Sequence, residues 1–357
     1  MDLALIVLAL PLIYLIFIKL YLKETITWTE WALNVFIVVV SVIAVLEFSK
    51  YIQHHDIEIW NGAVVSKHDE KVSCTHSYSC DCTTYKNSDG STSESCATCY
   101  KHDFDVDWIV KTTAGNIKID RVDEQGIVEP KRYSNVQIGE AASLEHRFEN
   151  YIKAVPESLF NDQNTSIKSI DRVLPLYPKV FDYYKINRVL VDAQAIDAKY
   201  VSDLNAALNA GLKELGSKKE VNVIVVLTDY PDGFSYRDSL RSKWLNGKKN
   251  DVVVLIGVGE NYEVKWSHVF GWSKNELTNL SISEDIIKLK KVDDALNLSS
   301  VILSNIEKYF ERDSMQNYEY LKDSIEPPLW VILLALFLGL SFSIGLSIYF
   351  HKSIRFE

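Results

Sequence analysis

All five cysteines of the chain gather in one short stretch, as two close pairs and a single residue, with two histidines beside them. Two close pairs across a loop can converge on a tetrahedral zinc ion, whose borderline-soft character suits thiolate and imidazole ligands. In an oxidising compartment the same cysteines form disulfides, and an odd count leaves one thiol over. Either alternative predicts a crosslinked, loop-rich β region. The residues concerned are Cys74, the pairs Cys80–Cys82 and Cys96–Cys99, and the histidines His76 and His102.

Carboxylates form the second group of candidate ligands. Asp229 and Asp232 follow the carboxyl end of a predicted buried strand, where open α/β sheets place their ligands. Together with Asp251 they could hold a divalent cation such as Ca²⁺ through oxygen ligands. A tight turn competes with this interpretation, because Pro231 and Gly233 occupy positions that turns favour. We favour the turn.

Several functional classes are excluded by the sequence. The chain carries none of the motifs typical of P-loop proteins, α/β-hydrolases, zinc metalloproteases or dinucleotide-binding enzymes. Its formal net charge is −10, from 38 basic and 48 acidic residues, and it has no basic run. Such a balance argues against nucleic acid as a partner. We therefore do not favour an enzyme or a nucleic-acid-binding protein.

Three stretches are almost free of charged residues: residues 3–22, 29–48 and 328–350. A helix that spans a bilayer needs about 20 apolar residues, so we predict three transmembrane helices, two of them within residues 1–50. The first stretch lacks the basic leader and small-residue cleavage site of a signal peptide, and a second apolar stretch follows at once. Small and polar residues inside the stretches predict close helix packing or homo-oligomer contact. They are Asn34, Ser41, Gly339, Ser343 and Gly345.

The distribution of lysine and arginine around these stretches predicts the orientation. Lys19 and Lys23 lie in or beside the short connection, and Lys352 and Arg355 lie at the tail, residues 351–357. The positive-inside rule places both segments in the cytoplasm. The N-terminus and the large body are then extracytoplasmic, the C-terminus is cytoplasmic, and the membrane is an inner membrane.

The body divides into two parts by pattern. Apolar and acidic residues alternate over residues 104–110, as in a strand that is buried on one face. This pattern predicts a Cys-rich β module over residues 51–160, and a trailing helix is expected at Leu144–Ala154. Residues 161–186 are expected to be a linker.

Residues 187–315 alternate between strand and helix patterns. Val221–Leu227 and Asp251–Val258 are nearly unbroken apolar runs, typical of strands covered on both faces. Asp197–Leu215 carries an apolar stripe at helical spacing, and Gly216 is expected to end that helix. These features predict a small α/β sandwich. The expected fold class is an α+β membrane protein with three transmembrane helices, a Cys-rich β module and the α/β sandwich.

The order of residues in this second part resembles the TPM domain family. The family is named for a thylakoid lumen protein, a photosystem II repair protein and a nicotinic-receptor accessory protein. The likeness rests on Val189–Asp192, a buried strand ending at Asp229, a helix carrying Trp244, a turn at Gly247 and the pair Asn250-Asp251. Two features depart from the family pattern: Val252 replaces a glycine, and residues 264–269 differ from the family's strand.

The resemblance implies an anchored domain outside the cytoplasm. Members of the family bind calcium, hydrolyse phosphate esters or act as accessory and assembly factors, so each of these is an expectation here. The overall layout also resembles uncharacterised membrane proteins of large tailed phages.

Three functional hypotheses follow. The first is a membrane-anchored, non-enzymatic accessory or assembly factor that presents its extracytoplasmic domain to a membrane or envelope protein. The second is a metal-dependent phosphoesterase that uses Asp229, Asp232 and Asp251 as cation ligands. The third is a cytoplasm-facing membrane adaptor with a zinc ribbon built from the cysteines.

Overall fold

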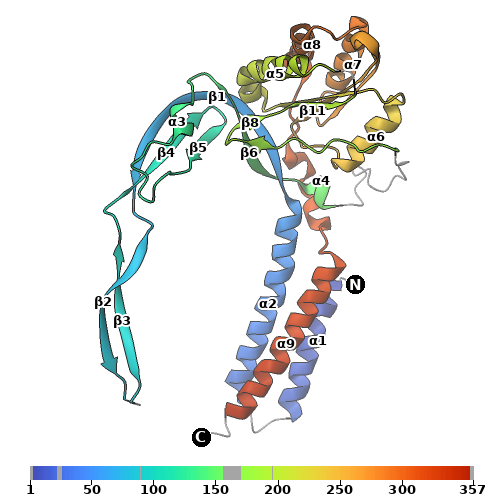
Figure 1. Cartoon of the computed structure of the whole chain (residues 1–357). Helices are drawn as coiled ribbons and strands as arrows, with labels where there is room; N and C mark the ends of the chain where they lie inside the picture. Colours follow the sequence, from blue (N-terminus) through green and yellow to red (C-terminus); the bar gives the residue numbers. More distant parts are fainter. Residues whose placement is uncertain (1–2, 22–25, 89, 156–169, 195, 354–357) are drawn as a thin grey trace. The chain divides into compact units, whose positions relative to one another are not determined.

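The computed structural model describes residues 3–21, 26–88, 90–155, 170–194 and 196–353 (Figure 1). Predictions that fall on Leu22, Lys23, residues 161–169 or residues 354–357 lie outside these ranges. The chain is a mixed α+β protein with two compact units. The helical unit comprises Met1–Asp56, Arg147–Thr165 and Ser314–Glu357, and the body comprises Ile57–His146 and Ser166–Asp313.

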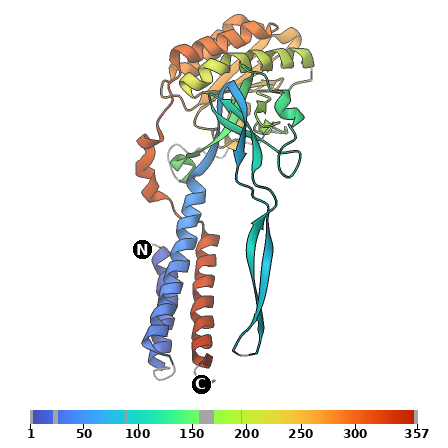
Figure 2. The same ribbon diagram turned by 90° about the vertical axis from the view of Figure 1, so that its left-hand side faces the viewer.

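The helical unit is built on three apolar helices: α1 (Leu3–Tyr21), α2 (Trp28–His54) and α9 (Leu329–Ser353). They lie side by side in Figures 1 and 2 and bury a shared set of apolar side chains. Two segments, Trp28–His54 and Leu329–Lys352, are long and apolar enough to cross a membrane, and Ile6–Tyr21 is a shorter apolar helix. The unit also contains the single turn α4 (Tyr151–Ala154) and the 3₁₀ segment η3 (Met315–Ser324).

Asn34 and Gly339 lie where these helices meet, as predicted, whereas Gly345 has open space around it. The Asn34 amide donates hydrogen bonds to the Ser343 carbonyl at 3.3 Å and to the Ser347 hydroxyl at 3.2 Å. A Cβ at Gly339 would lie 3.0 Å from Val42 and 3.1 Å from Pro11. The absence of a side chain at Gly339 therefore lets α9 approach both other helices closely.

The first sheet of the body has the strand order β5-β4-β1-β6. Its strands are β1 (His55–Val72), β4 (Asp105–Thr112), β5 (Gly115–Ile119) and β6 (Ala141–Glu149), and the short helix α3 (Lys131–Ser134) lies between β5 and β6 along the chain. The hairpin of β2 (Ser77–Lys86) and β3 (Thr92–Tyr100) leaves this sheet between β1 and β4. It forms its own two-stranded sheet, which extends away from the first (Figures 1 and 2).

The prediction of a helix at Leu144–Ala154 is wrong. Residues up to Glu149 belong to β6, and only one helical turn, α4, follows. Burial along β6 alternates from Leu144 onward between partly buried and exposed residues, which is the period of a strand. The neighbouring strand β1 supplies the backbone partners that make the extended form favourable.

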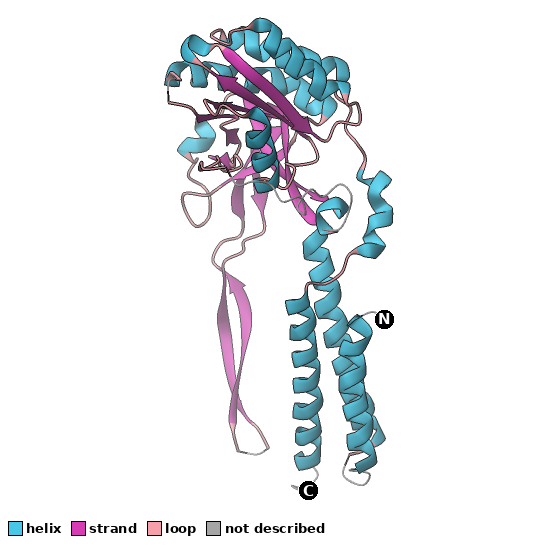
Figure 3. Cartoon of the chain, turned by 90° about the vertical axis from the view of Figure 1, so that its right-hand side faces the viewer, coloured by secondary structure: helices cyan, strands magenta, loops and turns pink. Residues whose placement is uncertain are grey.

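The second sheet has the order β12-β11-β10-β9 and lies between helices. The strands β9 (Val189–Asp192), β10 (Asn222–Thr228) and β11 (Asp251–Val258) are parallel, and β12 (Val264–Gly271) is antiparallel. The helices α5 (Ala198–Lys219), α7 (Leu277–Leu289) and α8 (Ala295–Tyr309) cover one face, and α6 (Gly233–Lys243) covers the other (Figures 1 and 3). The remaining short elements are β7 (Val180–Phe181), β8 (Lys185–Ile186) and η2 (Glu260–Tyr262).

Burial along β10 confirms the prediction of a strand covered on both faces. All of its residues are buried, and successive side chains enter two different cores. Val223 and Val225 pack with Leu208 of α5, whereas Ile224 and Val226 pack in the core on the α6 side. The absence of alternation in the sequence follows from this double coverage.

Gly216 does not end its helix, because α5 continues to Lys219. A Cβ at Gly216 would lie 2.4 Å from the Cβ of Asn61, a residue of β1. The glycine therefore permits close contact between α5 and the first sheet. Its role is in packing between elements and not in helix termination.

A buried arginine joins the two sheets of the body. Arg188 has no exposed surface, and its guanidinium donates to Ser143 of β6 at 2.8 Å, to Asn209 and Asn222 at 2.5 Å each, and to Asn61 of β1. Burial lowers the pKa of Arg188 to about 9. Since buried polar groups need partners, these side chains fix the positions of the two sheets relative to each other.

Candidate functional site

Four of the five cysteines crosslink the β2–β3 hairpin. Cys80 is bonded to Cys99 and Cys82 to Cys96, with Cα–Cα distances of 5.8 and 4.0 Å. Both disulfides join β2 to β3, and the pairing of these strands is irregular between Cys80 and Thr83. These thiols therefore bond to each other and do not converge on one zinc ion.

The hairpin buries almost none of its side chains. All but one residue of β2 and all but two of β3 are exposed. Tyr78, Tyr85 and Tyr100 are 50%, 53% and 59% exposed. A two-stranded hairpin without a core is marginal in water, so the disulfides supply the constraint that burial supplies elsewhere.

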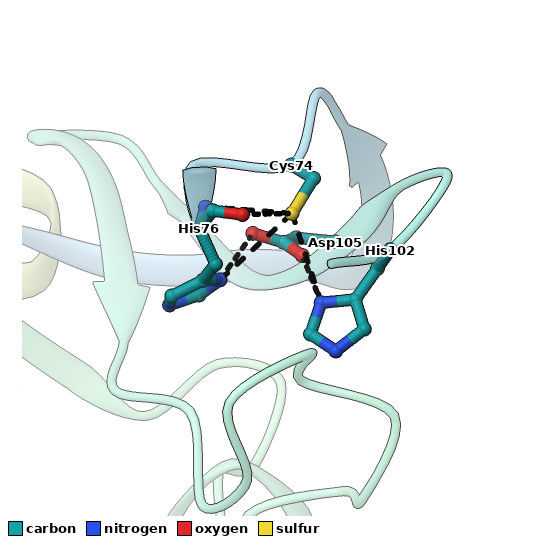
Figure 4. Close-up of side chains that lie close together, drawn as sticks. All are labelled: Cys74, His76, His102 and Asp105. Carbon is teal, nitrogen blue, oxygen red and sulfur yellow. Dashed lines mark hydrogen bonds and ion pairs between the residues drawn. The ribbon is translucent and has the colours of Figure 1, made fainter. Parts of the chain in front are cut away.

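The fifth cysteine lies in a separate cluster at the base of the hairpin (Figure 4). Cys74 is buried and unpaired, and its sulfur lies 4.0 Å from His76 Nδ1 and 3.7 Å from His102 Nδ1. Asp105 completes the group, with carboxylate oxygens 3.4 Å from His76 Nδ1 and 3.3 Å from His102 Nδ1. One ligand atom from each residue lies within 4.8 Å of all the others, so this cluster could hold a metal ion.

The backbone on both sides of the hairpin positions this cluster. Cys74 and His76 lie on the connection from β1 to β2, and His102 lies on the connection from β3 to Asp105, the first residue of β4. The amide of Lys101 donates to the His76 carbonyl at 3.0 Å, which keeps the two connections together.

Arg121 organises the carboxylates behind the cluster. Its guanidinium donates to Asp105 at 2.7 Å and to Asp107 at 2.9 and 2.5 Å. Burial alone would raise the pKa of Asp105, but the Thr75 amide and Arg121 hold it well below its usual range. Asp105 is therefore a carboxylate, a form that can bind a cation.

The sequence pattern did not identify Asp105 as a ligand. Its place in the apolar–acidic alternation predicted a solvent-facing residue, whereas Asp105 is fully buried and Asp107 nearly so. Pairing with Arg121 and Lys118 makes this burial possible. The spacing His102-x-x-Asp105, close to the lone Cys74, is the signal that could have indicated the site.

The three aspartates proposed as a cation site do not lie together. In the parallel pair β10–β11, Asp251 is level with Asn222 at the start of both strands, whereas Asp229 follows Thr228 at the end of β10. Asp229 accepts a hydrogen bond from Arg172 at 2.6 Å. Asp232 is the N-cap of α6 and accepts from the amides of Phe234 and Ser235, and Gly233, which the turn interpretation placed in a turn, is the first residue of that helix.

Asp251 is instead an interior residue. It accepts hydrogen bonds from Tyr177 at 2.9 Å, from the Asn222 amide at 2.8 Å and from the Lys248 backbone at 2.7 Å. Burial raises the pKa of its carboxyl to about 6. The arrangement supports the packing of the loop around Tyr177 onto the sheet.

A comparison with models of known protein families gave no match, and no curated protein matches the chain in sequence. The likeness to the TPM family thus rests on residue order alone. The functional argument depends on the hairpin and on the cluster at its base.

Proposed function

We propose that the protein is a membrane-anchored, non-enzymatic accessory or assembly factor that presents an extracytoplasmic body to a protein partner. In this proposal α1, α2 and α9 all span the membrane. The N-terminus and the body lie outside the cytoplasm, the C-terminal tail lies inside it, and the second sheet with its helices is a TPM-like domain. The partner is a membrane or envelope protein.

The exposed, doubly crosslinked hairpin carries this proposal. Disulfides persist in oxidising compartments, which supports an extracytoplasmic body. Exposed tyrosines combine a large apolar surface with a hydroxyl group and are enriched in protein interfaces. The hairpin presents three of them, Tyr78, Tyr85 and Tyr100, on a scaffold that contributes no core of its own.

The helices support anchoring at both ends of the body along the chain. The two segments that are long and apolar enough to cross a membrane precede and follow the body in sequence. Lys19 supports placement of the α1–α2 connection at a membrane surface. Its ammonium donates to the Ile26 carbonyl and lies 4.6 Å from the centre of the Trp28 ring. A cationic side chain beside an aromatic ring is typical of the membrane surface.

Site-specific crosslinking tests the partner. A photoreactive residue at Tyr78 should capture one defined membrane or envelope protein in native membranes, and the same residue at exposed Leu280 of α7 should not. Equal capture from both positions, or none from Tyr78, would contradict a partner on the hairpin.

Thiol labelling tests the orientation. In intact cells a membrane-impermeant reagent should label the four hairpin cysteines only after reduction, because they are bonded to each other in two pairs. Labelling that requires broken membranes would place the body in the cytoplasm and contradict the proposed topology.

A further inference from the structure

The cluster of Cys74, His76, His102 and Asp105 has the donor set of a metal site. It offers one thiol, two imidazoles and one carboxylate. Calcium and magnesium take oxygen ligands, so a set with sulfur and nitrogen does not suit them. Mixed sulfur, nitrogen and oxygen ligands in a group of four are typical of zinc.

The donor atoms of the four residues lie close enough together to surround one zinc ion. With usual zinc–ligand distances, neighbouring nitrogen and oxygen ligands lie about 3.4 Å apart, and sulfur and nitrogen ligands about 3.6 Å apart. The Asp105 carboxylate lies close to both imidazoles through different oxygens: Oδ2 is 3.4 Å from His76 Nδ1, and Oδ1 is 3.3 Å from His102 Nδ1. The Cys74 sulfur lies 4.0 and 3.7 Å from the same two nitrogens. One ligand atom from each residue, with a single carboxylate oxygen among them, lies within 4.8 Å of the others, so the four atoms move closer together when zinc binds.

The surroundings supply the outer partners that metal sites use. Ligating carboxylates are commonly held by further hydrogen bonds, and Arg121 and the Thr75 amide hold Asp105 in this way. One thiolate and one carboxylate neutralise a Zn²⁺ ion, and Asp107 balances the charge of Arg121. A thiolate bound to zinc is also protected from exchange with the neighbouring disulfides, which explains how a fifth cysteine can persist beside them.

We infer that Cys74, His76, His102 and Asp105 form a structural zinc site that clamps the base of the β2–β3 hairpin. Cys74 and His76 come from the connection that enters the hairpin, His102 comes from the connection that leaves it, and Asp105 is the first residue of β4. All four coordination positions are filled by protein, as in structural and not catalytic zinc sites. The ion joins the exposed hairpin to the first sheet, a role that does not depend on the identity of any partner.

Metal content tests the site directly. The full chain, purified in detergent without a histidine tag or reductant, is dialysed against Zn²⁺ and then freed of excess metal. Plasma mass spectrometry should find one zinc per chain. Cys74→Ser and His102→Asn should each weaken Zn²⁺ binding by at least about 100-fold, because loss of a ligand exceeds the effect of losing an outer partner.

His55→Asn is the matched control. It removes a member of another group that could hold a metal, His54, His55 and Glu149, and should leave the zinc content unchanged. Zinc that is lost in His55→Asn and kept in Cys74→Ser would overturn the inference, as would a wild-type chain without zinc.

Cobalt substitution gives a result that does not rely on any variant folding. Co²⁺ in the wild-type site should show the intense visible bands of tetrahedral coordination and a near-ultraviolet charge-transfer band from the Cys74 thiolate. A Co²⁺ spectrum without the thiolate band, or the weak spectrum of a six-coordinate ion, would overturn the assignment.

Discussion

Two pairs of neighbouring strands in the body are stabilised in opposite ways. The β2–β3 hairpin is exposed along nearly its whole length and carries two disulfides. The parallel pair β10–β11 is buried at every residue and contains no cysteine. The hairpin is held by restriction of the unfolded chain, and the sheet by removal of apolar surface from water.

This difference shows where the molecule can carry a variable, accessible surface. Side chains of β10 and β11 enter two close-packed cores, so most changes there disturb packing. The hairpin has no core to disturb, so its exposed side chains are free to serve contacts with other molecules. A crosslinked strand pair thus separates folding from recognition.

The largest effect on stability is expected from Arg188→Ala. This variant tests how strongly the buried sheet that contains β10 and β11 depends on one polar side chain. The substitution removes a charged donor from the side-chain oxygens of Asn61, Asn209 and Asn222 and opens a cavity. We expect the free energy of unfolding of the body to fall by about 3–5 kcal/mol in urea titrations. Lys218→Ala, at an exposed position on α5, should change it by less than about 0.5 kcal/mol. Similar values for both variants would contradict a role for Arg188 in joining the sheets.

Removal of one crosslink tests the hairpin side. Without Cys82–Cys96, which closes a separation of 14 residues, the hairpin should lose about 3 kcal/mol of protection against local opening. Hydrogen exchange should show faster exchange in β2 and β3 for the double variant Cys82→Ser/Cys96→Ser, with unchanged rates in β10 and β11. Ser79→Ala, exposed on the same hairpin, is the control. Faster exchange in β10 would show that the two strand pairs are coupled.

The buried carboxyl of Asp251, at the start of β11, makes the stability of the second sheet depend on pH. Because burial raises its pKa from 3.8 to about 6, the folded state holds the proton more tightly than the unfolded state does. Its contribution to stability is therefore complete below pH 3.8 and is lost as pH rises to about 6, by up to about 3 kcal/mol.

Asp251→Asn isolates this contribution. Asparagine keeps an oxygen acceptor but does not titrate, so the difference in unfolding free energy between wild type and variant should fall across this window and stay constant above it. Carboxylates with lowered pKa, such as Asp105, contribute equally to both proteins and cancel in the difference. Parallel stability curves for the two proteins would show that Asp251 does not titrate in this range.

The buried sheet was predictable from the sequence because its signals are local. Apolar runs of β-branched residues gave β10 and β11 nearly to the residue, and the stripe on α5 gave that helix. The predicted bounds also placed Asp251 at the start of one strand and Asp229 after the end of the other. In parallel strands these positions lie at opposite edges of the sheet, so the separation of the two carboxylates already followed from the prediction. For this sheet, the order of residues along the chain was enough to predict the strands and the helix α5.

The site at the hairpin base was less predictable because its partners are distant in sequence. Nothing local marks Asp105 as buried, since Arg121 makes its burial possible from another segment. The division of the cysteines into two disulfides and one member of a His–Asp cluster likewise depends on the strand register, which the spacing alone left open. The wrong prediction of a helix at Leu144–Ala154 has the same cause, because pairing with the distant strand β1 determines the conformation of this segment.

The smallest effect on stability is expected at the exposed tyrosines, where the comparison between the two strand pairs is sharpest. Tyr78→Ala should change the unfolding free energy of the body by less than about 0.5 kcal/mol, because half of the side chain is already exposed. The same variant should weaken capture of the partner by a crosslinker at Tyr85, whereas Leu280→Ala should not. A loss of stability above about 1 kcal/mol would mean that Tyr78 is packed against other residues in solution. The hairpin would then be part of a core, and its exposure would no longer argue for recognition.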